Sequence, residues 1–200
     1  MRSAVLHRSR VAPAFARAGP GLCLGMALLG WGPAWGAPAS IQALSSEYEA
    51  KAALLLNFVR FTDWPAEAFT SAEAPFVIGV VGKDPFGAAL DKTFSGKSVK
   101  GRSFVVKRLN ADQNLKSCHL LFVPATEKRR QRDLLDKLRG APVLTVGETP
   151  DFRDHAGAVQ FFSKDNGVGF NINLNAAKAG KLHISSNVLR QADGVWGRYE

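Results

Sequence analysis

Short apolar runs alternate with helical patterns along this 200-residue chain, and this alternation restricts its fold more than any other feature. Phe76–Val81, Leu120–Val123 and Val143–Val146 are short and almost wholly apolar, which is typical of buried strands. Ala158–Ser163 and Gly167–Leu174 predict two more strands, joined by a hairpin-like turn. This order favours one three-layer α/β domain with a mixed, mostly parallel sheet, helices on both faces and a C-terminal strand hairpin.

Helical periodicity describes the segments between the strands. Apolar residues recur at three- and four-residue steps over residues 48–59, and Ser45 or Ser46 could cap this helix. Asp84 followed by Pro85 predicts the N-cap and first position of a second helix. The remaining expected elements are a strand at Val99–Leu109, a charged helix at Glu127–Arg139, and helical segments at Asn175–Gly180 and Ser185–Ala192.

The first 39 residues differ in composition from the rest of the chain. Four arginines precede the uncharged run Gly21–Trp35, and small residues follow it, which is the pattern of a secretory signal peptide. A membrane anchor is the alternative, but the apolar run is short and interrupted by glycines and Pro33. We therefore expect cleavage near residue 39, with 40–200 forming a soluble, exported α/β domain. Cleavage would remove those four arginines and lower the net charge from +9 for the whole chain to +5 for residues 40–200.

The stretch VIGVVGKDPFG contains glycines and a lysine that suggest a phosphate loop. A phosphate loop requires Ser or Thr after the lysine, whereas Asp84 follows Lys83 here, and a carboxylate repels phosphate. The glycine spacing does not fit a dinucleotide fingerprint either. The turn is therefore interpreted as a strand-to-helix connection, and ligand contact by Gly82, Lys83, Asp84 and Gly87 is a speculative alternative.

No group of residues in the sequence forms a recognisable catalytic or metal site. Cys118 would be the only cysteine after cleavage, so no internal disulfide is expected, and it is interpreted as a small core residue. His119 is adjacent to it on a strand, where neighbouring side chains point to opposite faces. Neither His155 nor His183 has a partner at metal-ligand spacing. We expect no enzyme activity, no cofactor and no metal.

The charge pattern and the polar strands instead suggest binding. Lysines and arginines gather in 97–108 and 128–132, which could contact an acidic partner or lipid headgroups, while the mild net charge argues against nucleic acid. The segment FNINLN alternates apolar residues with Asn171, Asn173 and Asn175. These amides form either a solvent-facing ladder or a partner surface. The tail Val195–Tyr199 carries two large aromatic residues that dock on the core or contact a partner.

Several stretches together resemble a known family. They are EYEAKAALLLNFVRFTDWP, VIGVVGKDPFG, CHLLFV, PVLTVGE and GFNINLNAAKAGKLHISSNVLRQA, which occur in this order between Glu47 and Ala192. The set resembles the YfiR family of exported bacterial proteins.

The resemblance implies an α/β regulator without enzyme activity. Proteins similar to YfiR hold an inner-membrane diguanylate cyclase inactive by binding its periplasmic sensor part. An OmpA-like outer-membrane lipoprotein can sequester the regulator, which releases cyclic di-GMP synthesis and favours biofilm. The resemblance also implies a homodimer. It implies partner contacts through the positions that match the family's partner surface: Phe161, Phe162, Asn171 and Ala177.

The hypothesis from the sequence is therefore a periplasmic regulatory binding protein that represses a membrane-bound diguanylate cyclase. The alternative is a periplasmic small-molecule sensor that uses the Gly82–Gly87 turn as a pocket wall. The two differ in one observable property, because only the sensor would be stabilised by a small ligand.

Overall fold

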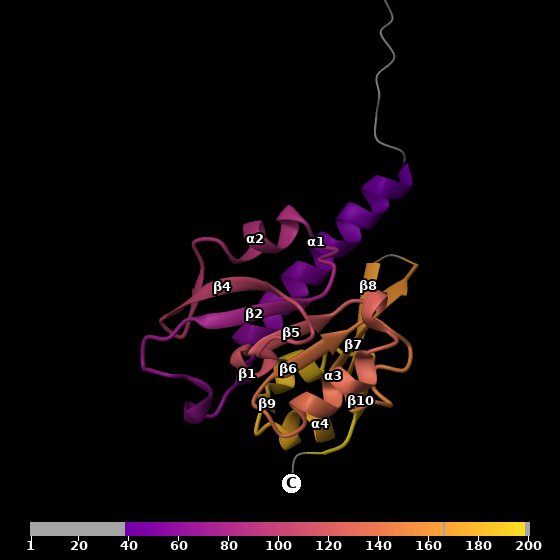
Figure 1. Cartoon of the computed structure of the whole chain (residues 1–200). Helices are drawn as coiled ribbons and strands as arrows, with labels where there is room; N and C mark the ends of the chain where they lie inside the picture. The colour runs from indigo at the N-terminus through magenta and orange to yellow at the C-terminus, as the bar shows by residue number, and fades with distance from the viewer. Residues whose placement is uncertain (1–38, 166, 199–200) are drawn as a thin grey trace, which may run out of the picture. The chain divides into compact units, whose positions relative to one another are not determined.

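A mixed eight-stranded sheet forms the centre of the molecule (Figure 1). The structure is a computed structural model that describes residues 39–165 and 167–198, with side chains described from Ala43 onward. In sheet order the strands are β10 (Gly194–Trp196), β8 (Gly167–Asn173), β7 (Val159–Lys164), β6 (Leu144–Gly147), β5 (Leu120–Val123), β2 (Phe76–Val81), β4 (Arg102–Leu109) and β3 (Ser98–Val99).

Most neighbouring strands in this sheet are parallel. The antiparallel pairs are β7 with β8 and β3 with β4, and every other pair in the order is parallel. The predicted mixed, mostly parallel sheet with a C-terminal hairpin is confirmed. A separate two-stranded sheet pairs β1 (Thr62–Asp63) with β9 (His183–Ile184) and had not been predicted.

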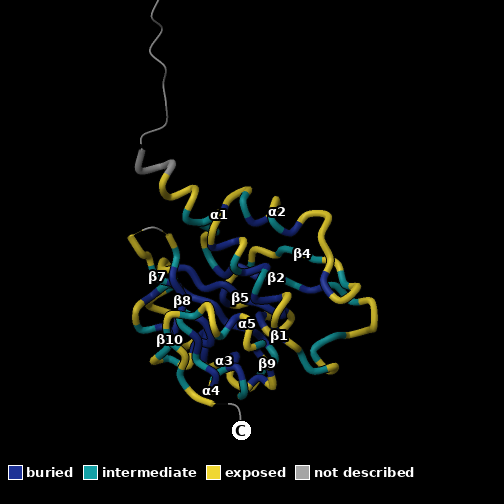
Figure 2. Tube along the Cα trace, turned by 180° about the vertical axis from the view of Figure 1, so that it is seen from behind, coloured by how far each residue is buried: buried dark blue, intermediate teal, exposed yellow. Residues whose placement is uncertain are grey.

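Helices lie on both faces of the sheet, as the sequence predicted. The helices are α1 (Ala39–Arg60), α2 (Ala88–Phe94), α3 (Gln131–Leu138), α4 (Leu174–Ala179) and α5 (Ser186–Leu189), with 3-10 turns η1 (Ala66–Ala68), η2 (Leu115–Ser117) and η3 (Ala125–Glu127). Figure 1 shows α1 and α3 on opposite faces. Figure 2 shows that the first described turns of α1 are exposed and extend beyond the buried core.

The larger core lies between the sheet and the face that α1 covers. Alternate strand residues such as Ile78, Phe122 and Phe161 point to this face and pack against Leu55 and Phe58 of α1. The Phe58 ring stacks on Phe161 with 5.8 Å between centroids. Burial of these side chains is the main force that holds α1 on the sheet.

The smaller core lies under α3. Leu134, Leu135 and Leu138 of α3 pack on Leu121 and Val123 of β5, whose other residues face α1. This alternation explains why the apolar runs lack polar residues, since both faces of the central strands are covered. The smaller core contains no residue of β7, β8 or β10, and the same face of those strands is therefore left without a helix among the described residues.

Three local predictions are wrong, each for a physical reason. Helix α1 begins before Ser45 and Ser46, so neither serine caps it. Asp84 is not an N-cap, because Gly87 turns the chain with φ +55 and α2 begins only at Ala88. The Asp84 carboxylate instead accepts a hydrogen bond from the Phe86 amide at 2.7 Å, which forms an Asx turn.

The third correction concerns the strand predicted at Val99–Leu109. The structure has a hairpin there, because Lys100 and Gly101 both have positive φ (52° and 77°) and connect β3 to β4 in two residues. The expected signal peptide lies outside the described residues, apart from Ala39. Within the described part of the chain, no helix combines the length and apolar character that crossing a bilayer would require.

Candidate partner-binding surface

The face of β7, β8 and β10 that no described helix covers carries a continuous group of amides and aromatic rings. The register places Gln160 opposite Asn171 and then Gly194, while Asn173 lies beside Trp196. We call this surface the amide–aromatic face, and its members are Gln160, Phe162, Asn171, Asn173 and Trp196. All five residues are half-buried, so a partner can reach their side chains.

Two glycines allow the aromatic rings to lie flat on the sheet. A Cβ on Gly169 would come within 2.5 Å of the Phe162 ring, and one on Gly194 within 3.2 Å of the Trp196 ring. Any larger residue at these positions would lift the rings away from the strands. Such close packing holds each ring in one orientation, which lowers the entropy cost of using it as a contact.

Charged side chains border the two rings. The Arg153 guanidinium lies 4.1 Å from the centroid of the Trp196 ring, and the Lys164 ammonium lies 5.8 Å from the Phe162 ring. Lys164 also pairs with Asp193, and this hydrogen bond lowers the pKa of the Asp193 carboxyl. Arginine stacked on tryptophan is a frequent feature of strong contacts in protein interfaces.

The three amides on this face differ in how they are used. The Gln160 amide donates to the carbonyls of Thr149 and Pro150, both at 3.0 Å. Asn173 caps α4, because its side-chain oxygen accepts from the Asn175 amide at 3.1 Å. Asn171 has no side-chain hydrogen bond to any described residue, so its amide is the one that remains available to a partner.

The structure separates the four residues that the sequence had assigned to partner contacts. Phe162 and Asn171 lie together on the amide–aromatic face. Phe161 is fully buried against α1, and Ala177 is fully buried on α4. Neither can contact a partner without unfolding, so their assignment as contact residues is corrected: alternation along β7 turns adjacent phenylalanines to opposite faces.

The sequence did not single out Gln160 or Arg153 as part of this surface. Gln160 and Phe162 are two residues apart on β7, so they lie on the same face of the sheet. Strand alternation in the sequence was therefore enough to place Gln160 on this surface. Arg153 lies in an irregular loop held by Phe152, which is buried between Gly147 and Gly157. Its position over Trp196 depends on tertiary packing that no local pattern reveals.

The Gly82–Gly87 turn lies at the carboxyl end of β2, beside the point where the sheet order reverses. A Cβ on Gly82 would come within 2.2 Å of the Glu127 carboxylate, so a carboxylate already covers this glycine. Asp84 accepts a hydrogen bond from Arg108 at 2.9 Å. These two carboxylates make the turn unsuitable for an anion, and the speculative ligand site at Gly82, Lys83, Asp84 and Gly87 stays an untested prediction.

A buried ionic group joins α1 to the strand ends nearby. The Lys51 ammonium lies 2.7 Å from both Glu47 and Glu148, and only 5% of its side chain is exposed. Glu148 also accepts from the Ala125 amide at 2.9 Å and from the Tyr48 hydroxyl at 3.2 Å. Burial, with Glu148 beside it, raises the pKa of Tyr48. These contacts satisfy one another, so the group fixes α1 rather than offering a reactive side chain.

Cys118 and His119 are both buried in the fold. Burial raises the pKa of the Cys118 thiol to about 11, and the thiol lies under Gly79, as expected for a core residue. The His119 ring accepts from the Val77 amide at 3.0 Å and approaches the Ala68 carbonyl at 3.1 Å. No group of three or more His, Cys, Asp or Glu side chains within the described residues could hold a metal ion.

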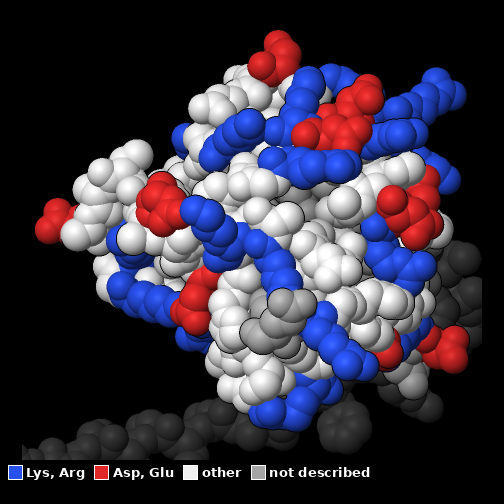
Figure 3. Space-filling model, turned by 90° about the horizontal axis from the view of Figure 1, so that it is seen from below, with Lys and Arg blue, Asp and Glu red and all other residues white. Residues whose placement is uncertain are grey.

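The basic side chains do not form one continuous patch on the face shown in Figure 3. Lysines and arginines there are interrupted by acidic and uncharged residues over the end of the molecule that carries α4. In the first basic group, Arg102 donates to the carbonyls of Ser71 and Ala74, and Lys100 pairs with Asp63. These side chains are therefore used within the fold rather than gathered into the clustered basic patch that is typical of nucleic-acid binders.

Comparison with known proteins identifies the family. A model of the YfiR/HmsC-like family matches residues 48–193, which is most of the chain. The chain belongs to the YfiR/HmsC-like family. YfiR/HmsC-like proteins are periplasmic regulators in diguanylate cyclase signalling rather than enzymes. No curated protein matches the chain.

A solved structure is similar to the YfiR/HmsC-like chain in fold. It is a conserved domain protein from Vibrio cholerae O1 biovar El Tor, with a TM-score of 0.53 and 10% sequence identity. The match covers 74% of this chain and 60% of the other, so the chain spans less than two thirds of that protein. At this identity the likeness supports the fold alone.

Proposed function

We propose that this YfiR/HmsC-like protein represses a membrane-bound diguanylate cyclase by binding its periplasmic sensor part. The observation that carries the proposal is the amide–aromatic face, where two fixed rings and the free amide of Asn171 lie on one uncovered side of the sheet. This combination is typical of the centre of a protein interface, where a few aromatic and arginine side chains supply most of the binding energy.

The mechanism is a shift between two states of the cyclase. A regulator that binds the inactive sensor conformation more tightly than the active one lowers the active population, without any chemistry of its own. Removal of the regulator by a competing partner restores the active state. A regulator of this kind requires a rigid binding surface, and side chains fixed on β-strands provide one.

The first test is binding of the purified protein to the periplasmic part of each membrane-bound diguanylate cyclase of its host, by calorimetry. We expect saturable binding to one of them, and we expect Phe162→Ser to weaken it by at least about tenfold, since a central aromatic hot spot contributes about 2 kcal/mol or more. Cyclic di-GMP in cells that carry the variant should rise accordingly.

Phe61→Ser is the matched control. Phe61 is also partly exposed, at 38%, but lies at the far end of α1 from Glu47, which touches Ser163 of β7. The helix between them spans roughly 20 Å at 1.5 Å per residue. Equal loss from both variants, or full repression by a folded Phe162→Ser protein, would assign the contact to another surface.

A further inference from the structure

Strand β4 has an open edge along most of its length. Its inner edge pairs with β2 from Phe104 to Leu109, whereas its outer edge pairs with β3 only at Arg102 and Ser103. Among residues 39–165 and 167–198, no strand pairs with the outer edge beyond Ser103. An open edge presents unpaired backbone N–H and C=O groups that can accept another strand.

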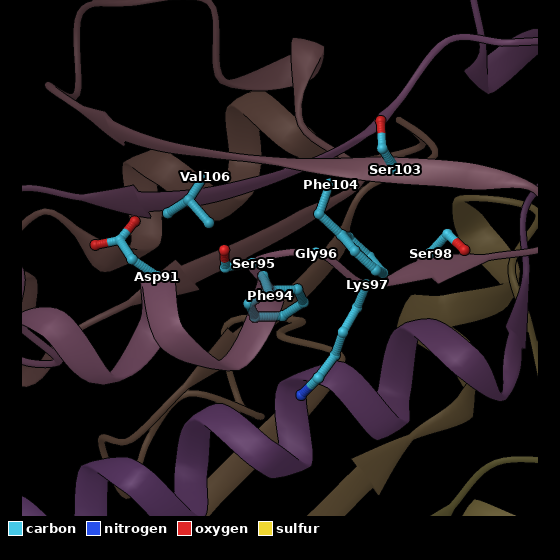
Figure 4. A pocket seen from close by; sticks show the side chains of 9 residues that line it. All are labelled: Asp91, Phe94, Ser95, Gly96, Lys97, Ser98, Ser103, Phe104 and Val106. Atoms are coloured by element: carbon cyan, nitrogen blue, oxygen red, sulfur yellow. The ribbon is translucent and has the colours of Figure 1, made fainter.

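A groove of about 600 Å³ runs beside this edge (Figure 4). It lies between β4 and the segment that leaves α2, and its floor is formed by Phe94, Phe104 and Val106. The Phe94 and Phe104 rings meet edge to face at 4.9 Å between centroids. Apolar side chains of an added strand could be buried against these three residues, because Phe104 and Val106 are only half-buried.

One residue that lines the groove, Asp91, belongs to an ion-paired group. Arg108 donates to the Asp91 carboxylate at 2.6 Å and to Asp84 at 2.9 Å, so one guanidinium offsets part of the negative charge of these two carboxylates. The Arg108 hydrogen bond lowers the pKa of the Asp91 carboxyl, which keeps it ionised and paired. Pairing with Arg108 therefore weakens the repulsion between these two carboxylates and an incoming carboxylate.

Two lysines at the edge have no acidic partner. Lys97 lines the groove, and Lys107 lies on the opposite face of β4; both are exposed, and neither is ion-paired to a described residue. A strand laid along β4 would pass Lys107, and Lys97 lines the groove from the segment that leaves α2. Lysines on an edge also disfavour pairing between two copies of the same chain, because the charges repel.

We propose that the open edge of β4 binds an extended acidic segment of a partner protein as an additional strand. Apolar side chains of that segment occupy the Phe94–Phe104–Val106 groove, and its carboxylates pair with Lys97 and Lys107. Backbone hydrogen bonds supply affinity, while the groove and the lysines supply selectivity. This surface is separate from the amide–aromatic face and does not depend on the function proposed for that face.

The test uses a blocked seven-residue peptide of alternating glutamate and valine, added to the full chain labelled with ¹⁵N. We expect amide shifts and slowed hydrogen exchange at Phe104–Leu109, and an affinity that falls as salt is raised. The same peptide with lysine in place of glutamate should bind at least about tenfold more weakly, because it meets like charges.

Charge reversal tests the assignment without disturbing the core. Lys97→Glu with Lys107→Glu should weaken the glutamate peptide by at least about tenfold and strengthen the lysine peptide. Lys116→Glu with Lys128→Glu is the matched control, since it makes the same charge change at exposed lysines away from this edge. That control should leave both affinities nearly unchanged.

Any of four results would overturn the proposal. The peptide could cause no shifts at Phe104–Leu109 at millimolar concentration, or the shifts could map to another surface. The same amides could become protected without peptide as protein concentration rises, which would assign the edge to a second copy of the chain. If the Lys97/Lys107 and Lys116/Lys128 variants lost affinity for the peptide equally, the overall charge of the protein, and not this edge, would determine binding.

Discussion

His119 connects a surface turn to strand β2 through both ring nitrogens. The Val77 amide donates to its Nδ1, so the proton of the neutral ring is on Nε2, which can donate to the Ala68 carbonyl. Burial, the largest cause, lowers the pKa of His119 below its ordinary value of about 6.5. The ring is therefore neutral at physiological pH.

This arrangement predicts a pH dependence of stability. Because the folded pKa is lowered, the unfolded chain takes up the proton first, and the contribution of His119 is lost as the pH falls below about 6.5. His119→Asn, whose oxygen can replace Nδ1 as acceptor, should reduce the difference in urea midpoint between pH 7 and pH 5. An unchanged slope in the His119 variant would contradict the assignment.

Gly79 shows how tightly the smaller core is packed. A Cβ there would lie 2.6 Å from the Cys118 sulfur and 2.8 Å from Leu121. Gly79→Ala should therefore cost about 1–3 kcal/mol of unfolding free energy, as overpacked cores do. Adding Cys118→Ala removes the sulfur, so the double variant should lose less than the sum of the single losses in a urea-denaturation cycle. Simple additivity would mean that the two sites do not touch.

At the scale of elements, the docking of α1 depends on its buried ionic group as well as on apolar packing. Lys51→Met leaves the Glu148 carboxylate without its ammonium partner, although the Ala125 amide and Tyr48 hydroxyl remain. We expect a loss of about 3–5 kcal/mol, which is typical when one member of a buried pair is removed. Lys92→Met, on the exposed side of α2, should change the urea midpoint very little. Similar small losses of stability in both variants would show that the ion pairs of Lys51 are not needed to hold α1 on the sheet.

The sequence was sufficient for the elements whose signals are local. The runs Phe76–Val81 and Leu120–Val123 coincide with β2 and β5, because buried parallel strands leave an uninterrupted apolar pattern. Short edge strands carry no such pattern, and β10, β1 and β9 were missed because each is defined only by its pairing partner. The break at Lys100 was missed because a lysine rarely adopts positive φ.

The candidate surface was predicted in part for the same reason. Alternation along β8 correctly placed Asn171 and Phe170 on different faces of the sheet. The same alternation along β7 was not applied to Phe161 and Phe162. A Phe161→Asp variant would now be expected to disrupt the core rather than a contact. The contribution of Trp196 required knowledge that β10 adds to the sheet beside β8.

For the whole molecule, the sheet order places the two proposed binding surfaces far apart. The amide–aromatic face begins at β10 and β8, whereas the open edge belongs to β4 at the other end. With strands about 4.8 Å apart, the strands of this face, β7 included, lie roughly 20–30 Å from β4. We expect both to be occupied at once: saturation with the glutamate–valine peptide should change the affinity of the cyclase sensor part by less than about twofold in calorimetry. Competition between them would require an overlap that this topology does not provide.

The small sheet formed by β1 and β9 joins segments that are distant in the chain, Thr62 with Ile184 and Asp63 with His183. The α1 face of the core likewise needs Phe170, Ile172 and Leu174 from beyond residue 165. A chain that has emerged only as far as β7 therefore lacks part of the contacts that hold its first helix, and contacts of such long sequence separation form slowly. Late closure of this kind keeps a nascent chain extended for longer, which is the state that a secretory channel can thread across a membrane.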